Sequence, residues 1–339
     1  MTEPSNTIIP VTAASEPLIA AKGLGKEFYA RSMFRSAVTV RAVSDVTLSV
    51  GRGEIVGLVG ESGSGKSTIG RMLMGLIPPT SGDVTFDGAA LGKTRGSALR
   101  RMRRRMQMIF QDPYSSLDPR RSIGAQIADG MQIHGLVDAS ETKWRVGQFL
   151  EEVGLPAEAA RRHPHEFSGG QRQRISIARA LSTEPEFIVA DEPVSALDVS
   201  IQAQIVRLLH DLGRKRSLSI LFISHDLAVV RSLCDRVVVL YLGRIMEEGP
   251  AREVFLNPQH PYTRALISSA PSLDAEQRKN RILLKGDPPS PVNPPSGCVF
   301  RTRCMHAIPA CATAVPALEK RAEGHYAACI RPEVASTSP

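Results

Sequence analysis

Short apolar runs predict the strands of this chain. The segments 55–59, 187–190 and 217–224 are largely apolar, and 108–110 is a shorter run of the same kind. A strand covered on both faces gives a continuous apolar run, whereas a half-exposed strand alternates apolar and polar residues. The pattern therefore predicts strands that are buried inside an α/β fold.

Two other stretches show helical spacing. The region between Gln111 and Ser168 is helix-rich by pattern, with apolar positions at Trp144, Val146, Phe149, Leu150 and Val153. The segment 93–105 has seven basic residues and no acidic one. We interpret it as a solvated helix whose apolar face comprises Leu99, Met102 and Met106. A nucleic-acid or lipid site is the less favoured interpretation, because no aromatic side chains interleave to stack bases.

A glycine-rich loop follows the first apolar run. Residues 60–67 read GESGSGKS, and 68–73 open a helix, so strand, loop and helix follow in the order of a phosphate loop. The glycines let backbone N–H groups turn toward a triphosphate, and the helix N-terminus adds partial positive charge. We expect Lys66 to reach the β- and γ-phosphates and the Ser67 hydroxyl to ligate Mg²⁺. The predicted nucleotide contacts in this segment are Gly60, Glu61, Ser62, Gly63, Ser64, Gly65, Lys66, Ser67 and Thr68.

Polar residues follow the other apolar runs. Asp191 and Glu192 end one run, His225 follows another, and Gln111 follows the shortest. Ligands of open parallel sheets bind at the carboxyl ends of the strands. Asp191 is suited to the outer shell of Mg²⁺, and Glu192 to the polarisation of an attacking water. We expect His225 to contact a γ-phosphate.

A second phosphate-binding motif lies further along the chain, where residues 167–171 read FSGGQ. Ser168 and Gln171 have the spacing of a capping box, and the helical segment 172–181 follows. The N-terminus of that helix would present a partial positive charge outward.

The order of these motifs resembles that of the ATP-binding cassette (ABC) ATPases, which drive membrane transporters. The matching strings are GESGSGKS, FQDP, FSGGQ, IVADEP, SALD and ISHD, with Phe167 in place of the usual leucine. The resemblance implies the P-loop NTPase fold of that family. It comprises a mainly parallel sheet, an antiparallel β subdomain and a helical subdomain at about 112–182, within a nucleotide-binding domain at 18–259. No internal repeat is visible, so we expect one cassette.

The resemblance also assigns roles. Gln111, Glu192 and His225 correspond to catalytic positions, with Gln111 as the Q-loop glutamine and His225 as the switch histidine. Phe28, or the adjoining Tyr29, corresponds to the aromatic residue that stacks on adenine. Mg²⁺ would be held by Ser67, Gln111 and Asp191, and Asp198 ends the D-loop. The signature residues, which act on the ATP of the opposite subunit, are Ser168, Gly169, Gly170 and Gln171.

Two strings narrow the resemblance to the oligopeptide/dipeptide importers: DPYSSLDPR at 112–120 and HPYTRAL at 260–266. This implies an ATPase that powers uptake of peptides, or of a related small solute, from the cytoplasmic face of the cell (inner) membrane. Its implied partners are two permeases, a second ATPase subunit (paralogous or identical), and, through the permeases, a solute-binding protein. The alternative is a soluble cassette ATPase acting on nucleic acid or ribosomes. That class usually has two cassettes or a long coiled-coil insertion, so we expect no nucleic-acid partner.

Composition agrees with a peripheral protein. The chain has 339 residues and a formal net charge of +8. It contains no apolar run of the length that spans a bilayer. Residues 1–17 are polar and lack the features of a signal peptide, and we expect them to form a disordered arm.

The C-terminal extension, 260–339, is rich in proline and carries four of the five cysteines: Cys298, Cys304, Cys311 and Cys329. Structural disulfides are rare in a reducing compartment. The intervening segments of 5, 6 and 17 residues are too loose for a zinc ribbon. Three interpretations stay open: a [4Fe–4S] cluster, which relatives with this extension hold; free packed thiols; and, behind both, zinc.

Overall fold

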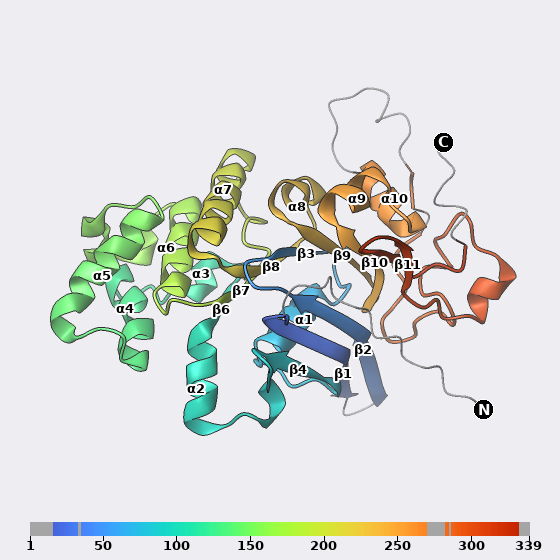
Figure 1. Cartoon of the computed structure of the whole chain (residues 1–339), viewed down its shortest axis with the longest axis horizontal. Helices are drawn as coiled ribbons and strands as arrows, with labels where there is room; N and C mark the ends of the chain where they lie inside the picture. The colour runs from blue at the N-terminus through green and yellow to red at the C-terminus, as the bar shows by residue number, and fades with distance from the viewer. Residues whose placement is uncertain (1–15, 33–34, 270–281, 285, 332–339) are drawn as a thin grey trace.

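The structure is a computed structural model that describes residues 16–32, 35–269, 282–284 and 286–331. The predicted N-terminal arm, 1–17, lies outside the described residues except for Glu16 and Pro17. Figure 1 shows an elongated molecule, with a helical region at one end, a central pair of sheets and the C-terminal extension at the other end.

The central sheet has eight strands. Their spatial order is β11 (Glu319–Ala322), β12 (His325–Ala327), β10 (Arg244–Pro250), β9 (Arg236–Tyr241), β3 (Ile55–Val59), β8 (Ser219–Ser224), β7 (Phe187–Asp191) and β6 (Met106–Ile109). The strands from β9 to β6 are parallel to one another, and those from β9 to β11 pair antiparallel. Every residue of β3, β7 and β8 is buried, which confirms the three strands that the apolar runs predicted, although β8 begins at Ser219 rather than Ser217.

A second, antiparallel sheet lies beside the first (Figure 1). Its strand order is β2 (Arg35–Val50), β1 (Ile19–Ser32), β4 (Ser81–Phe86) and β5 (Ala89–Ala90). Helix α1 (Lys66–Leu73) lies between the sheets, because Ile69, Met72 and Leu73 are buried in a core shared with residues of both. The helix that begins in the phosphate loop is therefore clamped by apolar packing on both sides.

The helical region lies at the β6 end of the central sheet (Figure 1). It comprises α3 (Pro113–Ser116), α4 (Ile123–His134), α5 (Ala139–Glu152), the 3₁₀ turns Ala157–Arg161 and Pro164–Glu166, and α6 (Gly169–Leu181). The predicted apolar face of α5 is right for Val146, Phe149, Leu150 and Val153, which are buried. The prediction is wrong for Trp144, which is 64% exposed. At helical spacing, Trp144 falls outside the stripe that the four buried residues form.

The basic segment forms helix α2 (Gly96–Arg105) after a 3₁₀ turn at Leu91–Lys93. Met102 is buried and Leu99 packs against the core, as expected of an apolar face. Met106 is also buried, but it begins strand β6 rather than continuing the helix. The predicted apolar face of the helix therefore included one residue, Met106, that lies beyond the end of α2.

The remaining helices cover the face of the central sheet opposite to α1 and the second sheet (Figure 1): α7 (Val199–Arg216), α8 (Leu227–Leu233), α9 (Ala251–Leu256) and α10 (Pro261–Ser269). The extension then contributes a 3₁₀ turn at Pro309–Ala312 and strands β11 and β12, which lengthen the central sheet beyond β10. Among the described residues, no helix is long and apolar enough to cross a membrane.

Candidate functional site

The phosphate loop connects β3 to α1 at the carboxyl end of the central strands. Two of its glycines are required by close packing. A Cβ atom at Gly60 would lie 2.1 Å from the Leu240 carbonyl oxygen, and one at Gly65 would lie 2.4 Å from that of Ala42. Both have positive φ angles, 153° and 102°, which glycine adopts without a steric penalty. The loop is thus held between β9 on one side and β2 on the other.

Lys66 is buried inside this loop. Its ammonium donates hydrogen bonds to the carbonyl oxygens of Gly60 at 2.8 Å and Glu61 at 2.9 Å. An ammonium has three N–H donors, so a third stays available for a phosphate oxygen. Burial lowers the pKa of Lys66, and the nearby carboxylates of Glu192 and Asp191 oppose that shift. The hydroxyl of Ser64 is also buried, without a hydrogen-bond partner in the described residues.

Ser67 and Asp191 lie together beside the loop. The Ser67 hydroxyl lies in the first turn of α1, and Asp191 is the last residue of β7. The hydroxyl donates a hydrogen bond to Asp191 Oδ1, with 2.8 Å between the two oxygen atoms. Burial raises the pKa of the Asp191 carboxyl, and the hydrogen bond from Ser67 opposes the shift. A hydroxyl and a carboxylate are ligands that Mg²⁺ takes alongside phosphate oxygens and water, so the pair fits that ion.

Glu192 is the point where three strand ends meet. Its Oε2 accepts a hydrogen bond from the Gln111 amide at 3.1 Å, and the same oxygen lies 3.4 Å from His225 Nδ1. The backbone of Glu192 has a φ of 45°, and its N–H donates to the Ile223 carbonyl at 3.0 Å. This strained conformation is held by the neighbouring strand β8, and such backbone strain concentrates at functional sites.

Phe28 and Tyr29 lie on the exposed part of β1. Lys26 of β1 pairs with Val43 of β2. Val43 is next in sequence to Ala42, the residue that packs on the phosphate loop. The Lys26 ammonium lies 5.2 Å from the centre of the Phe28 ring, and Phe28 is 42% exposed. The aromatic residue therefore lies near the loop on an open surface.

The signature residues lie apart from the loop, at the start of α6 in the helical region. The capping box is present: the Ser168 hydroxyl accepts from the Gln171 N–H at 3.3 Å, and the Gln171 side chain accepts from the Ser168 N–H at 3.0 Å. The helix begins at Gly169, three residues earlier than the sequence indicated. Ser168 and Asp198, which precedes α7, are both exposed. In the described part of the chain, no hydrogen bond or ion pair joins these residues to the phosphate loop.

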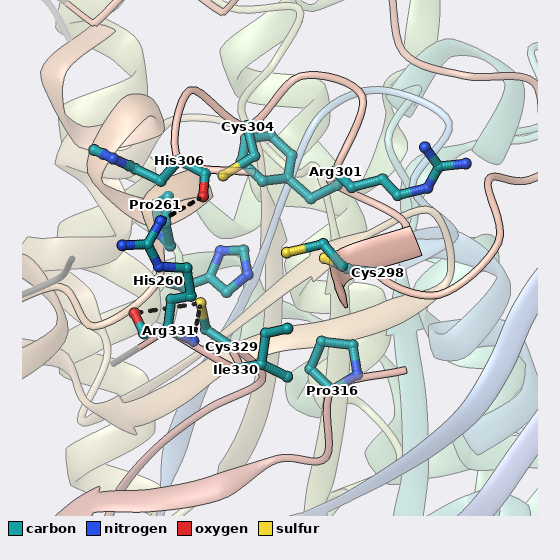
Figure 2. A pocket seen from close by; sticks show the side chains of 12 residues that line it. His260, Pro261, Cys298, Arg301, Cys304, His306, Pro316, Cys329, Ile330 and Arg331 are labelled. Atoms are coloured by element: carbon teal, nitrogen blue, oxygen red, sulfur yellow. Dashed lines mark hydrogen bonds between the residues drawn. The ribbon is translucent and has the colours of Figure 1, made fainter. Parts of the chain in front are cut away.

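The four clustered cysteines line a single pocket in the extension, and Figure 2 shows the thiols of Cys298, Cys304 and Cys329 turned toward a common space. The cavity among the lining atoms is small, about 20 Å³, roughly the room that one water molecule needs. Other lining residues include His260, Phe300, His306 and Pro316. No group of three or more His, Cys, Asp or Glu side chains in the described ranges is arranged to hold one metal ion.

The sulfur atoms in this pocket accept backbone hydrogen bonds. Cys298 accepts from the N–H groups of Phe300 and Arg301, Cys304 from that of His306, and Cys329 from that of Arg331 at 3.4 Å. Burial raises the pKa of Cys298, and raises that of Cys304 to about 11, against the effect of these bonds. The pocket thus presents donors that suit thiolate sulfur in surroundings where an uncompensated thiolate is costly.

Sequence analysis missed a set of contacts between the extension and the phosphate loop. Arg303 pairs with the Glu61 carboxylate at 2.7 Å, and the Tyr262 hydroxyl accepts the Glu61 N–H at 3.0 Å. The sequence predicts Glu61 as a nucleotide contact and gives no sign of these partners. The partners are separated by 242 and 201 residues along the chain, and no periodic pattern signals a pair at that distance.

Two family models match the sequence. One, described as "ABC transporter", matches residues 43–195, which run from β2 past the end of β7. The other, described as "Oligopeptide/dipeptide transporter, C-terminal region", matches residues 246–311, which include three of the four pocket cysteines.

Similar proteins extend the match to nearly the whole chain. A putative peptide import ATP-binding protein of Brucella ovis is 56% identical over 94% of this chain and 99% of its own length. The oligopeptide transport ATP-binding protein OppF of Haemophilus influenzae is 46% identical over 95% and 99%. Among solved structures, the dimeric ATP-binding cassette MJ0796 bound to ADP and phosphate has a TM-score of 0.61 and 29% identity, covering 69% of this chain and 99% of that one.

Proposed function

This chain belongs to the ATP-binding subunits of the oligopeptide/dipeptide ABC importers, and from that premise we propose how its residues divide the work of ATP hydrolysis. The triphosphate binds in the loop 60–67, where backbone N–H groups and the start of α1 face it. Lys66 donates its third N–H to a phosphate oxygen, and the buried Ser64 hydroxyl gains the partner it lacks. Phe28 stacks on the adenine.

Ser67, Asp191 and Gln111 would hold Mg²⁺, which neutralises charge on the β- and γ-phosphates when it is bound. Glu192 accepts a proton from the attacking water as the oxygen of that water bonds to the γ-phosphorus. The bond from that phosphorus to the bridging oxygen of ADP then breaks, and ADP and phosphate are released. His225 and Gln111 hold the Glu192 carboxylate in place and contact the γ-phosphate side of the site.

The observation that carries this assignment is the meeting of Gln111 and His225 at one oxygen of Glu192, beside the Ser67–Asp191 pair. In Glu192→Gln, ATP turnover should fall by about a hundredfold or more, since general-base catalysis contributes that much. Binding of ATP should persist, because the phosphate loop is unchanged. Turnover can be followed by phosphate release and binding by a fluorescent ATP analogue. A variant that hydrolyses ATP at the normal rate would show that Glu192 is not the base.

We propose that the complete site needs two ATPase subunits. The signature residues are exposed and lie apart from the loop of their own chain, so they are available to the ATP of another subunit. The positive end of α6 would then face a γ-phosphate across the interface. The partner is a paralogous ATPase or a second copy of this chain.

We further propose that the ATPase pair works with two permeases at the cytoplasmic face of the membrane, and takes peptides delivered by a solute-binding protein. The surface near Gln111 supports this: Phe110 and Tyr114 flank it and are 39% and 65% exposed, as apolar groups at a partner contact would be. Copurification of the tagged chain with two membrane subunits tests the assembly. Recovery with ribosomes instead would favour the alternative of a soluble cassette ATPase.

We propose that the extension holds a [4Fe–4S] cluster on Cys298, Cys304, Cys311 and Cys329. Four thiols at one pocket match the ligand count, and backbone N–H groups directed at three of the sulfurs suit cluster ligation. ATP hydrolysis requires no electron transfer, so we propose a structural role for the cluster. When bound, it would cross-link the loops of the extension.

A further inference from the structure

One loop of the extension reaches from the thiol pocket to the phosphate loop. It runs from Cys298 to Cys304, both of which line the pocket. Between them, Arg303 extends to the Glu61 carboxylate, with Nη1 to Oε2 at 2.7 Å, and to the Tyr241 hydroxyl at 3.4 Å. The Arg303 side chain is 8% exposed and that of Glu61 24%, so this pair is less exposed to water than most surface ion pairs.

A second contact fixes the backbone of the same glutamate. The hydroxyl of Tyr262, in α10, accepts the Glu61 N–H at 3.0 Å, and Tyr262 is fully buried. The carbonyl of Glu61 in turn accepts from the Lys66 ammonium at 2.9 Å. Glu61 is therefore bonded through its side chain and its N–H to the extension, and through its carbonyl to the cation that faces the phosphates.

Aromatic packing makes the connection rigid. The Phe300 ring lies in the same loop as Arg303, with its centroid 5.3 Å from both Tyr241 and Tyr262. Tyr241 and Tyr262 lie 4.7 Å apart. Such ring contacts carry a definite geometry, so a shift of the loop would disturb both hydroxyl groups that act on Glu61 and Arg303.

We propose that Arg303 is a positioning residue for the phosphate loop, so that the docked extension sets the affinity of the subunit for Mg–ATP. Arg303 and Tyr262 hold Glu61, and Glu61 holds the Lys66 ammonium toward the phosphates. The thiol pocket thereby acts on the nucleotide site, since the two ends of the Arg303 loop lie in its wall. This inference rests on the proposed role of the loop 60–67 in binding ATP.

The test is Arg303→Met, which keeps the aliphatic length of the side chain and removes the guanidinium. The Kd for Mg–ATP should rise by roughly three- to tenfold, within the range of coupling seen between residues in contact. Arg303→Lys should recover part of the affinity, because an ammonium also pairs with Glu61. The matched control is Lys320→Met, which removes a cation of the extension whose partner, Glu323, is 89% exposed. It should leave the Kd unchanged.

A double-mutant cycle separates positioning from general loosening of the extension. Glu61→Gln weakens the same pair from the phosphate-loop side and should raise the Kd by a similar factor. The double variant Glu61→Gln/Arg303→Met should then be little worse than either single variant. Additive effects, or an Arg303→Met protein with unchanged Kd, would overturn the proposal.

Lys66→Ala distinguishes this inference from the assignment of the site. If Lys66→Ala abolishes ATP binding and Arg303→Met has no effect, the loop binds ATP and the positioning role alone is wrong. If neither change alters binding, the assignment of the loop itself fails, and the positioning role with it.

Discussion

The proposed ATP site and the thiol pocket are built in opposite ways. The ATP site takes Lys66, Asp191, Glu192 and His225 from the ends of neighbouring strands or from the turn and helix that follow them. The thiol pocket is formed almost wholly by loops, with one 3₁₀ turn around Cys311. Strand pairing alone therefore brings the ATP residues together. The cysteines depend instead on contacts within the extension, and a bound cluster would add to these.

The sharpest test of this contrast is Cys304→Ser. Protein purified without oxygen should be brown and contain iron and acid-labile sulfide, and the variant should lose essentially all of both. Its extension should be cut faster by protease beyond Pro261, because the loops lose their cross-link. The control is Cys234→Ser: Cys234 is buried next to α8, outside the pocket, and its replacement should leave the iron content unchanged. Colourless, iron-free protein with a protease-resistant extension would favour packed thiols.

A smaller effect is expected where the extension joins the central sheet. Glu247 in β10 is fully buried and accepts from His325 of β12 at 2.7 Å, from the Gln259 N–H at 2.7 Å and from the His260 N–H at 2.9 Å. Glu247→Gln keeps the shape but replaces one acceptor oxygen by a donor. The free energy of unfolding should fall by about 3 kcal/mol, the cost of disturbing a buried, charge-assisted network.

Thermal and denaturant unfolding measure the change in Glu247→Gln, with the exposed Glu323→Gln as the control. If Glu247→Gln also binds Mg–ATP more weakly, the extension supports the ATP site through its attachment to β10. Unchanged stability would mean that the His325 contact contributes little to docking.

The smallest expected change in stability is at the signature. Ser168→Ala removes the hydroxyl that caps α6 and should cost about 1 kcal/mol of stability. The effect of Ser168→Ala on ATP binding and hydrolysis should be larger, and it should appear at the nucleotide site of the partner subunit. In the assembled transporter, labelling of the partner ATPase by a photoreactive ATP should fall while labelling of this chain persists. Loss confined to this chain would contradict the two-subunit site.

The same contrast explains what the sequence could predict. The buried strands β3, β7 and β8 are continuous apolar runs, and the residue types at their ends suit phosphate and Mg²⁺ chemistry. The convergence of Gln111 and His225 on Glu192 follows from the parallel pairing of β6, β7 and β8. Errors arose where the apolar pattern ended or weakened: Trp144 lies outside the buried stripe of α5, and Met106 belongs to β6.

The contacts of the extension could not be predicted in this way. Strands β11 and β12 are only 4 and 3 residues long, too short for a periodic signal. The Arg303–Glu61 pair joins positions 242 residues apart, and an arginine in a loop does not reveal its partner. The spacing of the cysteines indicated shared chemistry but not that their loop would touch the phosphate loop.

The lengthening of the central sheet by β12 has a consequence for biosynthesis. Glu247 and His325, which join β10 to β12, are 78 residues apart, so β10 emerges from the ribosome well before its neighbour. Until then, the outer edge of β10 has unpaired N–H and C=O groups, which can template pairing with another chain. Completion of this edge is thus a late, non-local event in folding. Nascent chains stalled before residue 319 should therefore self-associate or recruit chaperones, whereas the released chain should not.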